Sequence, residues 1–113
     1  MSLKNMGIAG LGALLAGWGG ALIGADVAAV AAEALAKKSG CLTCHSVAQK
    51  KGAPSYKSIA EKYKGKADAE PTLVKHLITN PKVKVDGKDE EHDSLKTKNE
   101  ADVRNVAKWI LSR

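Results

Sequence analysis

Apolar residues recur at helical spacing in four separate stretches of the chain, which predicts four short amphipathic helices. The first stretch covers residues 28–38 and is rich in alanine, and the second covers residues 56–63. The third begins near Pro71, and the fourth follows Asn99. The apolar positions are Val27, Val30, Ala31, Ala34 and Leu35, then Tyr56, Ile59, Ala60 and Tyr63, then Leu73, Val74, Leu77 and Ile78, and finally Val103, Val106, Ala107, Ile110 and Leu111.

The ends of these helices carry recognisable signals. Gly40 and Gly65 follow the first and second stretches, where glycine commonly ends a helix. Pro71 suits the first turn of the third helix, and Asn80-Pro81 ends it because a residue before proline avoids helical geometry. Asn99 is a good N-cap, with Asp102 at the third position as in a capping box.

The segment between the third and fourth helices, residues 81–98, is polar and charged, and we predict a long loop there. A long loop without secondary structure in a small domain is usually functional or disordered. No strand pattern, repeat or second domain is evident. The sequence therefore predicts an all-α domain of about four short helices.

Residues 1–25 have the pattern of a secretory signal peptide. Lys4 supplies a positive charge, an uncharged apolar run follows, and small residues come after it. We predict cleavage after Ala25, or alternatively after Ala31, which leaves a domain at residues 26–113 in the periplasm. The alternative is a retained membrane anchor, since residues 6–25 carry no charge and about 20 residues cross a bilayer.

The remaining domain is small and basic. Loss of Lys4 with the signal lowers the formal net charge from +6 to +5, and the chain contains no Phe. So short a domain buries little apolar surface and usually needs a staple. No basic helix or aromatic platform for a nucleic acid is visible, so nucleic acid is not an expected partner.

The pentapeptide Cys41-Leu42-Thr43-Cys44-His45 is the most informative motif. Cys-x-x-Cys-His is typical of c-type haem attachment. Two thiols on one helical turn can each bond a vinyl group of one porphyrin, and the adjacent imidazole can ligate the iron. The motif predicts one covalently attached haem c per chain. That haem would also supply the large apolar body that the small core lacks.

Other interpretations of the two cysteines are weaker. A thioredoxin-like dithiol would follow a strand, and no strand pattern precedes Cys41. Cys41, Cys44, His76 and His92 could together hold zinc, but the two histidines are sixteen positions apart, outside the compact spacing of zinc modules. A Cys41–Cys44 disulfide would close a small, strained loop.

Taken together, these features resemble the bacterial class I cytochromes c, particularly the small cytochrome c551/c8-like group. The resemblance rests on residues 40–45, on Pro54, on the helix at 56–63 and on the ending at 107–112. It implies a class I cytochrome c fold wrapped around the haem, with the first and last helices crossing. It also implies that the Pro54 carbonyl accepts a hydrogen bond from His45, which would orient this proximal imidazole.

The chain departs from this family at the second iron ligand, normally a methionine in the loop before the last helix. Its only methionines are Met1 and Met6, both in the predicted signal. His92 stands at nearly the expected place, seventeen positions before Trp109. We therefore predict His92 as the distal ligand opposite His45, giving bis-histidine iron. The alternatives are five-coordinate iron, or water or a lysine as the ligand.

His76 is the competing histidine. It belongs to the third predicted helix, between Leu73 and Leu77. In the resembling family this helix passes the propionate edge of the haem. We therefore predict that His76 contributes to cofactor binding by bonding a propionate. The alternative is a partly buried helix residue without a role.

The predicted function is a soluble, monomeric, periplasmic one-electron carrier between redox proteins, and not an enzyme. The alternative is a haem-based sensor or small-ligand-binding protein in which His92 can be displaced. Redox partners with acidic docking surfaces would suit a basic haem edge, although plain solubility also explains each lysine. The lysines expected to border that edge are Lys50, Lys51, Lys82, Lys84, Lys96 and Lys98.

Overall fold

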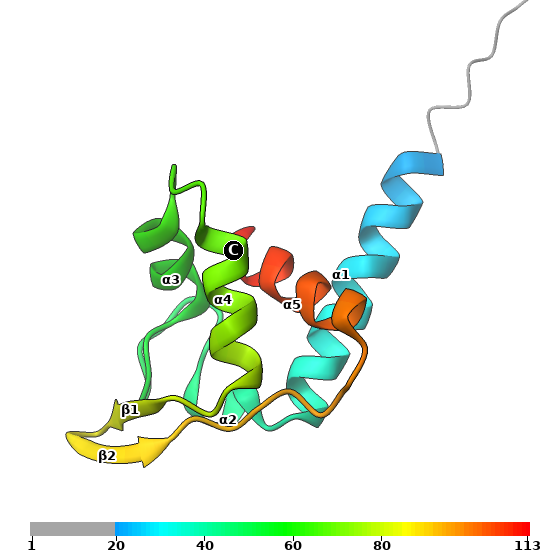
Figure 1. Cartoon of the computed structure of the whole chain (residues 1–113). Coiled ribbons are helices and arrows are strands. Elements are labelled where there is room, and N and C mark those ends of the chain that lie inside the picture. Colours follow the sequence, from blue (N-terminus) through cyan, green and yellow to red (C-terminus); the bar gives the residue numbers. More distant parts are fainter. Residues whose placement is uncertain (1–19) are drawn as a thin grey trace, which may run out of the picture.

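The computed structural model describes residues 20–113, with side chains from residue 27 onward (Figure 1). Most of the predicted signal peptide lies outside the described residues. The elements are α1 (Gly20–Lys38), α2 (Cys41–Cys44), α3 (Tyr56–Tyr63), α4 (Ala69–Ile78), β1 (Lys82–Val85), β2 (Lys88–Glu91) and α5 (Glu100–Leu111). Within this part of the chain, no helix combines the length and apolar character that a membrane crossing requires.

The four predicted helices are all present, so the expectation of a mainly helical fold is confirmed. The second helix has the predicted bounds as α3, and the fourth begins directly after Asn99 as α5. The third helix, α4, begins two residues before Pro71, and α1 extends further toward the N-terminus than the alanine-rich stretch. The cysteine motif forms one additional turn, α2.

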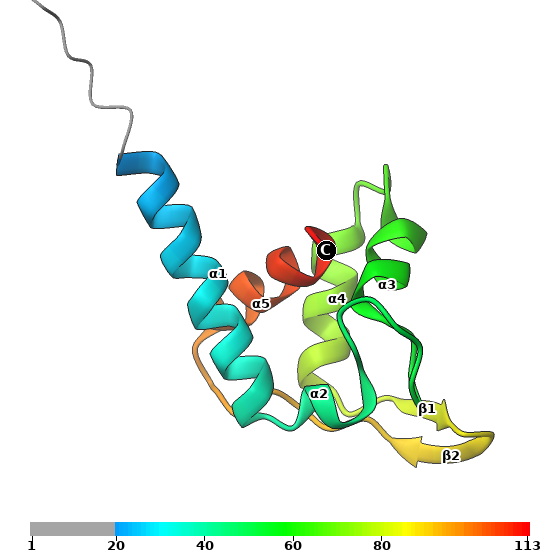
Figure 2. The same cartoon turned by 180° about the vertical axis from the view of Figure 1, so that it is seen from behind.

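α5 forms the centre of the fold, since it packs against α1, α3 and α4 (Figures 1 and 2). It crosses α1, where Ala36 and Ala107 are fully buried and their small side chains allow the two helices to approach closely. Trp109 is buried, although it lies at the edge of the predicted stripe, and its ring meets Tyr56 edge-on at 5.3 Å. Tyr56 and Trp109 thereby connect α3 to α5 within the core.

Several predicted core positions are wrong. In α1, the buried residues are Ala32 and Ala36, because the helix face that packs against α5 is not the predicted one. The predicted residues of this helix that are exposed instead are Val27, Val30, Ala31 and Ala34.

In α4, Ile78 is 50% exposed, whereas Leu73 and Leu77 of the same helix are buried. Residues four apart share one helix face, so Leu73 and Leu77 point toward α5 together. Ile78 is the last residue of α4 and lies one step further around the helix, where no other element covers it.

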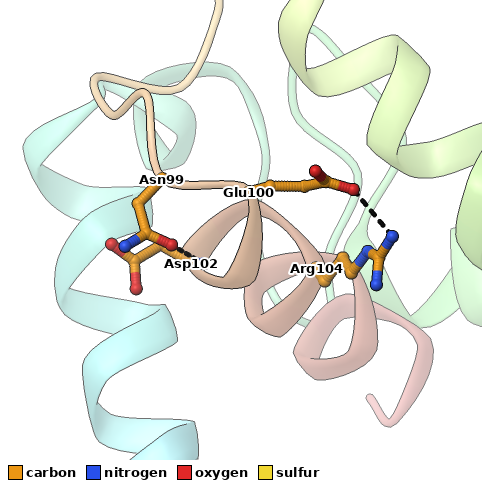
Figure 3. Close-up of polar contacts among 4 residues, drawn as sticks. All are labelled: Asn99, Glu100, Asp102 and Arg104. Carbon is orange, nitrogen blue, oxygen red and sulfur yellow. Dashed lines mark hydrogen bonds and ion pairs between the residues drawn. The ribbon is translucent and has the colours of Figure 1, made fainter.

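Asn99 caps α5 as predicted, because its side-chain oxygen accepts a hydrogen bond from the Asp102 main-chain N–H at 3.2 Å (Figure 3). The reciprocal half of a capping box is indirect. The Asn99 N–H donates to the Thr97 hydroxyl at 3.1 Å, and that hydroxyl lies 3.5 Å from an Asp102 carboxylate oxygen. A Glu100–Arg104 ion pair of 2.7 Å adds a surface contact along the first turn.

The predicted long loop at 81–98 contains a β-hairpin. The main error of the fold prediction was therefore that it expected no strands. β1 and β2 pair antiparallel, with Lys84 opposite Asp89. Asp86 and Gly87 form the two-residue turn, with φ of 50° and 80°. Asp-Gly favours such a turn because both positions need positive φ. The alternation Lys-Val-Lys-Val before it places Val83 and Val85 on the inner, half-buried side.

Candidate functional site

The cysteine motif opens onto a cavity of about 620 Å³. Such a volume is within the usual range for a cofactor or ligand site. Its walls come from every helix and strand of the described fold except α1, which ends at Lys38 just before the lining residues Ser39 and Gly40. Its lining residues include Cys41, Cys44, His45, Pro54, Tyr56, Ile59, Leu73, His76, Leu77, Val83, Val85 and His92. A mainly apolar cavity with a few imidazoles suits an iron porphyrin, whose flat faces are apolar.

Cys41 and Cys44 lie on the single turn of α2, directly after α1. Gly40 separates the two helices with a φ of 78°, a left-handed conformation that favours glycine. Both thiols are free and half-buried, and burial raises the pKa of the Cys41 thiol. Because a helix and not a strand precedes Cys41, the thioredoxin-like interpretation is wrong.

His45 is held by two contacts. Its Nδ1 lies 2.7 Å from the Pro54 carbonyl oxygen, and because a carbonyl can only accept, Nδ1 donates this hydrogen bond. Its ring also stacks on Tyr56 with centres 5.1 Å apart and planes 16° apart. The tautomer that donates from Nδ1 leaves Nε2 with a free lone pair, which is the form that binds a metal.

His92 lies in the same cavity as His45, with ring centres 6.1 Å apart. A metal–imidazole bond is about 2 Å long, so two imidazoles on opposite sides of one metal have ring centres roughly 6 Å apart. The buried Nδ1 of His92 has no hydrogen-bond partner. Burial, followed by the neighbouring imidazoles of His76 and His45, lowers the pKa of His92 and favours its neutral form. The donor set therefore fits an iron between these two residues.

His76 also lines this cavity, and its closest aromatic neighbour is His92. Their ring centres are 4.3 Å apart, in an edge-to-face arrangement. Burial, followed by the neighbouring imidazole of His45, lowers the pKa of His76. The structure therefore brings all three histidines of the chain to one site, with His76 next to the predicted distal ligand.

The four donors of the zinc alternative do not form one compact group. Among residues 20–113, no three His, Cys, Asp or Glu side chains are grouped so that they could hold a metal ion. A haem iron needs only two axial ligands from the protein, because the porphyrin nitrogens supply the others. The arrangement fits a haem better than a zinc site.

The rim of the cavity carries both signs of charge. All six lysines predicted to border it are exposed, and Lys84 and Lys62 line it directly. Lys84 is paired with Asp89 at 2.7 Å. Glu90, Glu91 and Asp93 also line the cavity, on the hairpin side. The expectation of a basic rim therefore needs correction, because the hairpin brings carboxylates to one edge.

Two features of the site were missed in the sequence. Tyr56 was identified only as a helix-face residue. Its stacking on His45 depends on the loop between α2 and α3, which returns so that the Tyr56 N–H donates to the Ser46 carbonyl at 2.9 Å. Val83 and Val85 form a wall of the cavity from β1, and a signal for them was present in the alternation before Asp86-Gly87.

The comparisons with known proteins agree with this geometry. A family model described as Cytochrome c matches residues 29–113. Over 78 residues the chain is 38% identical to cytochrome c2 of Rubrivivax gelatinosus, covering 68% of this chain and 91% of that protein. It is 36% identical to cytochrome c-551 of Pseudomonas aeruginosa, covering 72% of this chain and 75% of that one.

Solved structures extend the agreement to the fold. The class 1 cytochrome MtoD from Sideroxydans lithotrophicus ES-1 superposes with a TM-score of 0.70 and 45% identity, over 74% of this chain and 92% of that chain. Wild-type cytochrome c552 of Nitrosomonas europaea gives a TM-score of 0.58 and 31% identity, over 71% and 96%. With a family match over most of the chain and these relatives, the protein belongs to the cytochrome c family, has the class I fold, and is a mono-haem electron carrier with covalently attached haem c.

Proposed function

We propose that this protein is a periplasmic one-electron carrier whose haem iron is ligated by His45 and His92. The observation that carries the proposal is the pair of imidazoles in one cavity, with ring centres 6.1 Å apart, in a chain that has no methionine after Met6. Cys41 and Cys44 would hold the porphyrin through two thioether bonds. Haem supplies an iron that alternates between two oxidation states.

The role of the chain's own residues follows from their contacts. The Pro54 carbonyl fixes the ring orientation of His45, and Tyr56 supports its face. With protein ligands on both sides of the iron, no coordination position is open to a substrate, and we therefore propose electron transfer and not catalysis. Two imidazoles should give a lower reduction potential than the histidine–methionine pair.

The periplasmic location rests on the signal peptide, for which we propose cleavage after Ala25. The side-chain amide of Asn105 in α5 donates to the Ala28 carbonyl at 2.8 Å. Cleavage after Ala31 would remove this contact and shorten the helix that crosses α5. Cleavage after Ala25 leaves it intact, so the mature domain would comprise residues 26–113.

The sensor alternative has one observation in its favour. His92 directly follows a hairpin with four-residue strands, and all four residues of β2 are exposed. A two-stranded hairpin is at best marginally stable by itself. If the hairpin moved, His92 could leave the iron and admit a small ligand.

The two functions predict different spectra for the wild-type protein. For the carrier, we expect low-spin bis-imidazole iron in electron paramagnetic resonance and near-infrared spectra of the oxidised form. We also expect no binding of carbon monoxide by the reduced form over minutes, because His92 occupies the sixth position. Rapid and complete binding of carbon monoxide would instead favour the sensor.

Partners of this protein would be redox proteins, and we propose that their acidic surfaces dock near Lys62 and Lys84 at the cavity, on a monomer of this chain. Raising the ionic strength should then slow bimolecular electron transfer, because exposed charges are screened over about 8–10 Å at 0.1–0.15 M salt. Stopped-flow rates with an acidic redox protein would measure this.

Matched variants separate docking from overall charge. Lys62→Gln and Lys84→Gln remove charges at the cavity, whereas Lys108→Gln removes the same charge from the exposed side of α5. The first two should lower the rate and its salt dependence more than the third. Equal effects of all three would show that the lysines act only through net charge.

A further inference from the structure

The main chain around His92 is held by a set of hydrogen bonds that centres on Asn80. The Asn80 side-chain amide donates to the His92 carbonyl at 2.9 Å. Its oxygen accepts from the Ser94 hydroxyl at 2.8 Å. The His92 N–H donates to the Pro81 carbonyl, also at 2.8 Å. We call the group of Asn80, Pro81, His92 and Ser94 the Asn80 clamp.

The clamp connects His92 to a firmly packed part of the fold. Asn80 lies two residues after α4, in which Leu77 is buried in the core. The Leu77 carbonyl accepts from the Leu95 N–H at 2.9 Å, and Leu95 is buried as well. The segment after the hairpin is therefore attached to the end of α4 at three residues. Asn80 holds His92 and Ser94, and Leu77 holds Leu95.

The hairpin alone does not explain the position of His92. β2 is exposed along its full length, and the main neighbour of each strand is the other strand. Its tip lies against the loop at Gly52, where an added Cβ would approach Val85 Cγ1 and Asp86 Oδ2 to 3.2 Å. The clamp lies at the opposite end of the hairpin, where the chain leaves it toward His92.

The backbone of Asn80 supports a specific role for this residue. Its φ is 49°, a conformation that few residues other than glycine, asparagine and aspartate adopt easily. Glycine would satisfy the backbone but would offer no side chain. Aspartate would keep the acceptor for Ser94 but could not donate to His92. Asparagine is the residue that meets all three requirements.

We propose that Asn80 is a positioning residue that keeps His92 in the cavity and thereby sets how often the sixth iron position is open. This inference rests on the proposed ligation by His92. By fixing the His92 carbonyl, Asn80 restricts the main chain from which the imidazole projects. Without the clamp, His92 would leave the iron more often, and the carrier would acquire the ligand access of a sensor.

Asn80→Gly is the decisive variant, because it keeps the positive φ and removes only the amide. We expect it to raise the observed rate of carbon monoxide binding by the reduced protein about tenfold, as the loss of one or two ordinary hydrogen bonds implies. Asn80→Asp should give a similar increase, since it loses the donor to His92. Ser94→Ala, which loses one hydrogen bond, should give a smaller increase.

Thr79→Ala is the matched control. The Thr79 hydroxyl donates to the Lys75 carbonyl at 2.7 Å, so this change weakens the same helix end without touching His92. If Thr79→Ala raises the rate as much as Asn80→Gly at equal thermal stability, Asn80 acts only through the fold and the inference is wrong. It is also wrong if the Asn80 variants leave the rate unchanged while His92→Ala raises it.

A second result would instead concern the proposed function. If wild-type protein lacks the bis-imidazole signature, ligation by His92 fails, whatever the Asn80 variants do. Should Asn80→Gly prove too unstable to purify, Asn80→Asp and Ser94→Ala carry the same test through the same rate measurement.

Discussion

Replacing both Cys41 and Cys44 with serine is expected to abolish stable holoprotein. The two serines cannot form thioether bonds, so haem would be held only by axial ligation and apolar contact. Each single serine variant would keep one bond and give a reduced yield. The pyridine haemochrome spectrum and haem retention after denaturation would measure the loss, and Thr43→Ser in the same turn should retain normal haem content.

The expected effect extends beyond the cofactor to the fold. A cavity of about 620 Å³ in so small a domain leaves α3, α4 and the hairpin facing a space that only the haem fills. Domains of this size have little apolar burial in reserve. The double variant should therefore also lose most of its cooperative thermal transition in circular dichroism. A colourless wild-type protein that folds fully around zinc would contradict this prediction.

The helices were predictable because their signals are local. Asn99 caps α5, and Gly40 follows the end of α1. Apolar residues from Val103 to Ile110 recur at helical spacing. The hairpin was missed although Asp86-Gly87 is a strong turn signal. β2 contains only Lys, Asp and Glu, which rarely form strands. Its pairing with β1 places Lys84 opposite Asp89, and a sequence pattern does not show such a register.

The residues of the site also fall into two groups, those with a local sequence signal and those brought together only by the fold. The Cys-x-x-Cys-His motif predicts the attachment residues from the sequence alone, because their chemistry depends on nearby positions in one helical turn. The contact between His76 and His92 joins residues sixteen positions apart, and the sequence gives no sign of it. The Asn80 clamp joins a helix end to the segment beyond the hairpin. Such contacts depend on the tertiary fold, and only a structure reveals them.

The second large effect is expected at His92. In His92→Ala the sixth iron position would lose its ligand, so the reduced protein should bind carbon monoxide rapidly. The bis-imidazole signature of the oxidised protein should disappear. His92→Met would offer a thioether in its place, and we expect the reduction potential to rise by on the order of 0.1 V or more, within the ~0.8 V range that axial ligands span. Protein-film voltammetry and near-infrared spectra would measure both changes.

The neighbouring His76 makes a control necessary, because its ring lies 4.3 Å from that of His92 in the same cavity. His76→Ala should leave the bis-imidazole signature in place if His92 is the ligand. If the signature survives in His92→Ala and disappears in His76→Ala, His76 is the distal ligand instead. If it survives in both single variants and is lost only in the double variant, each histidine can replace the other. The geometry favours His92, because its ring centre lies 6.1 Å from that of His45 and its buried Nδ1 has no other partner.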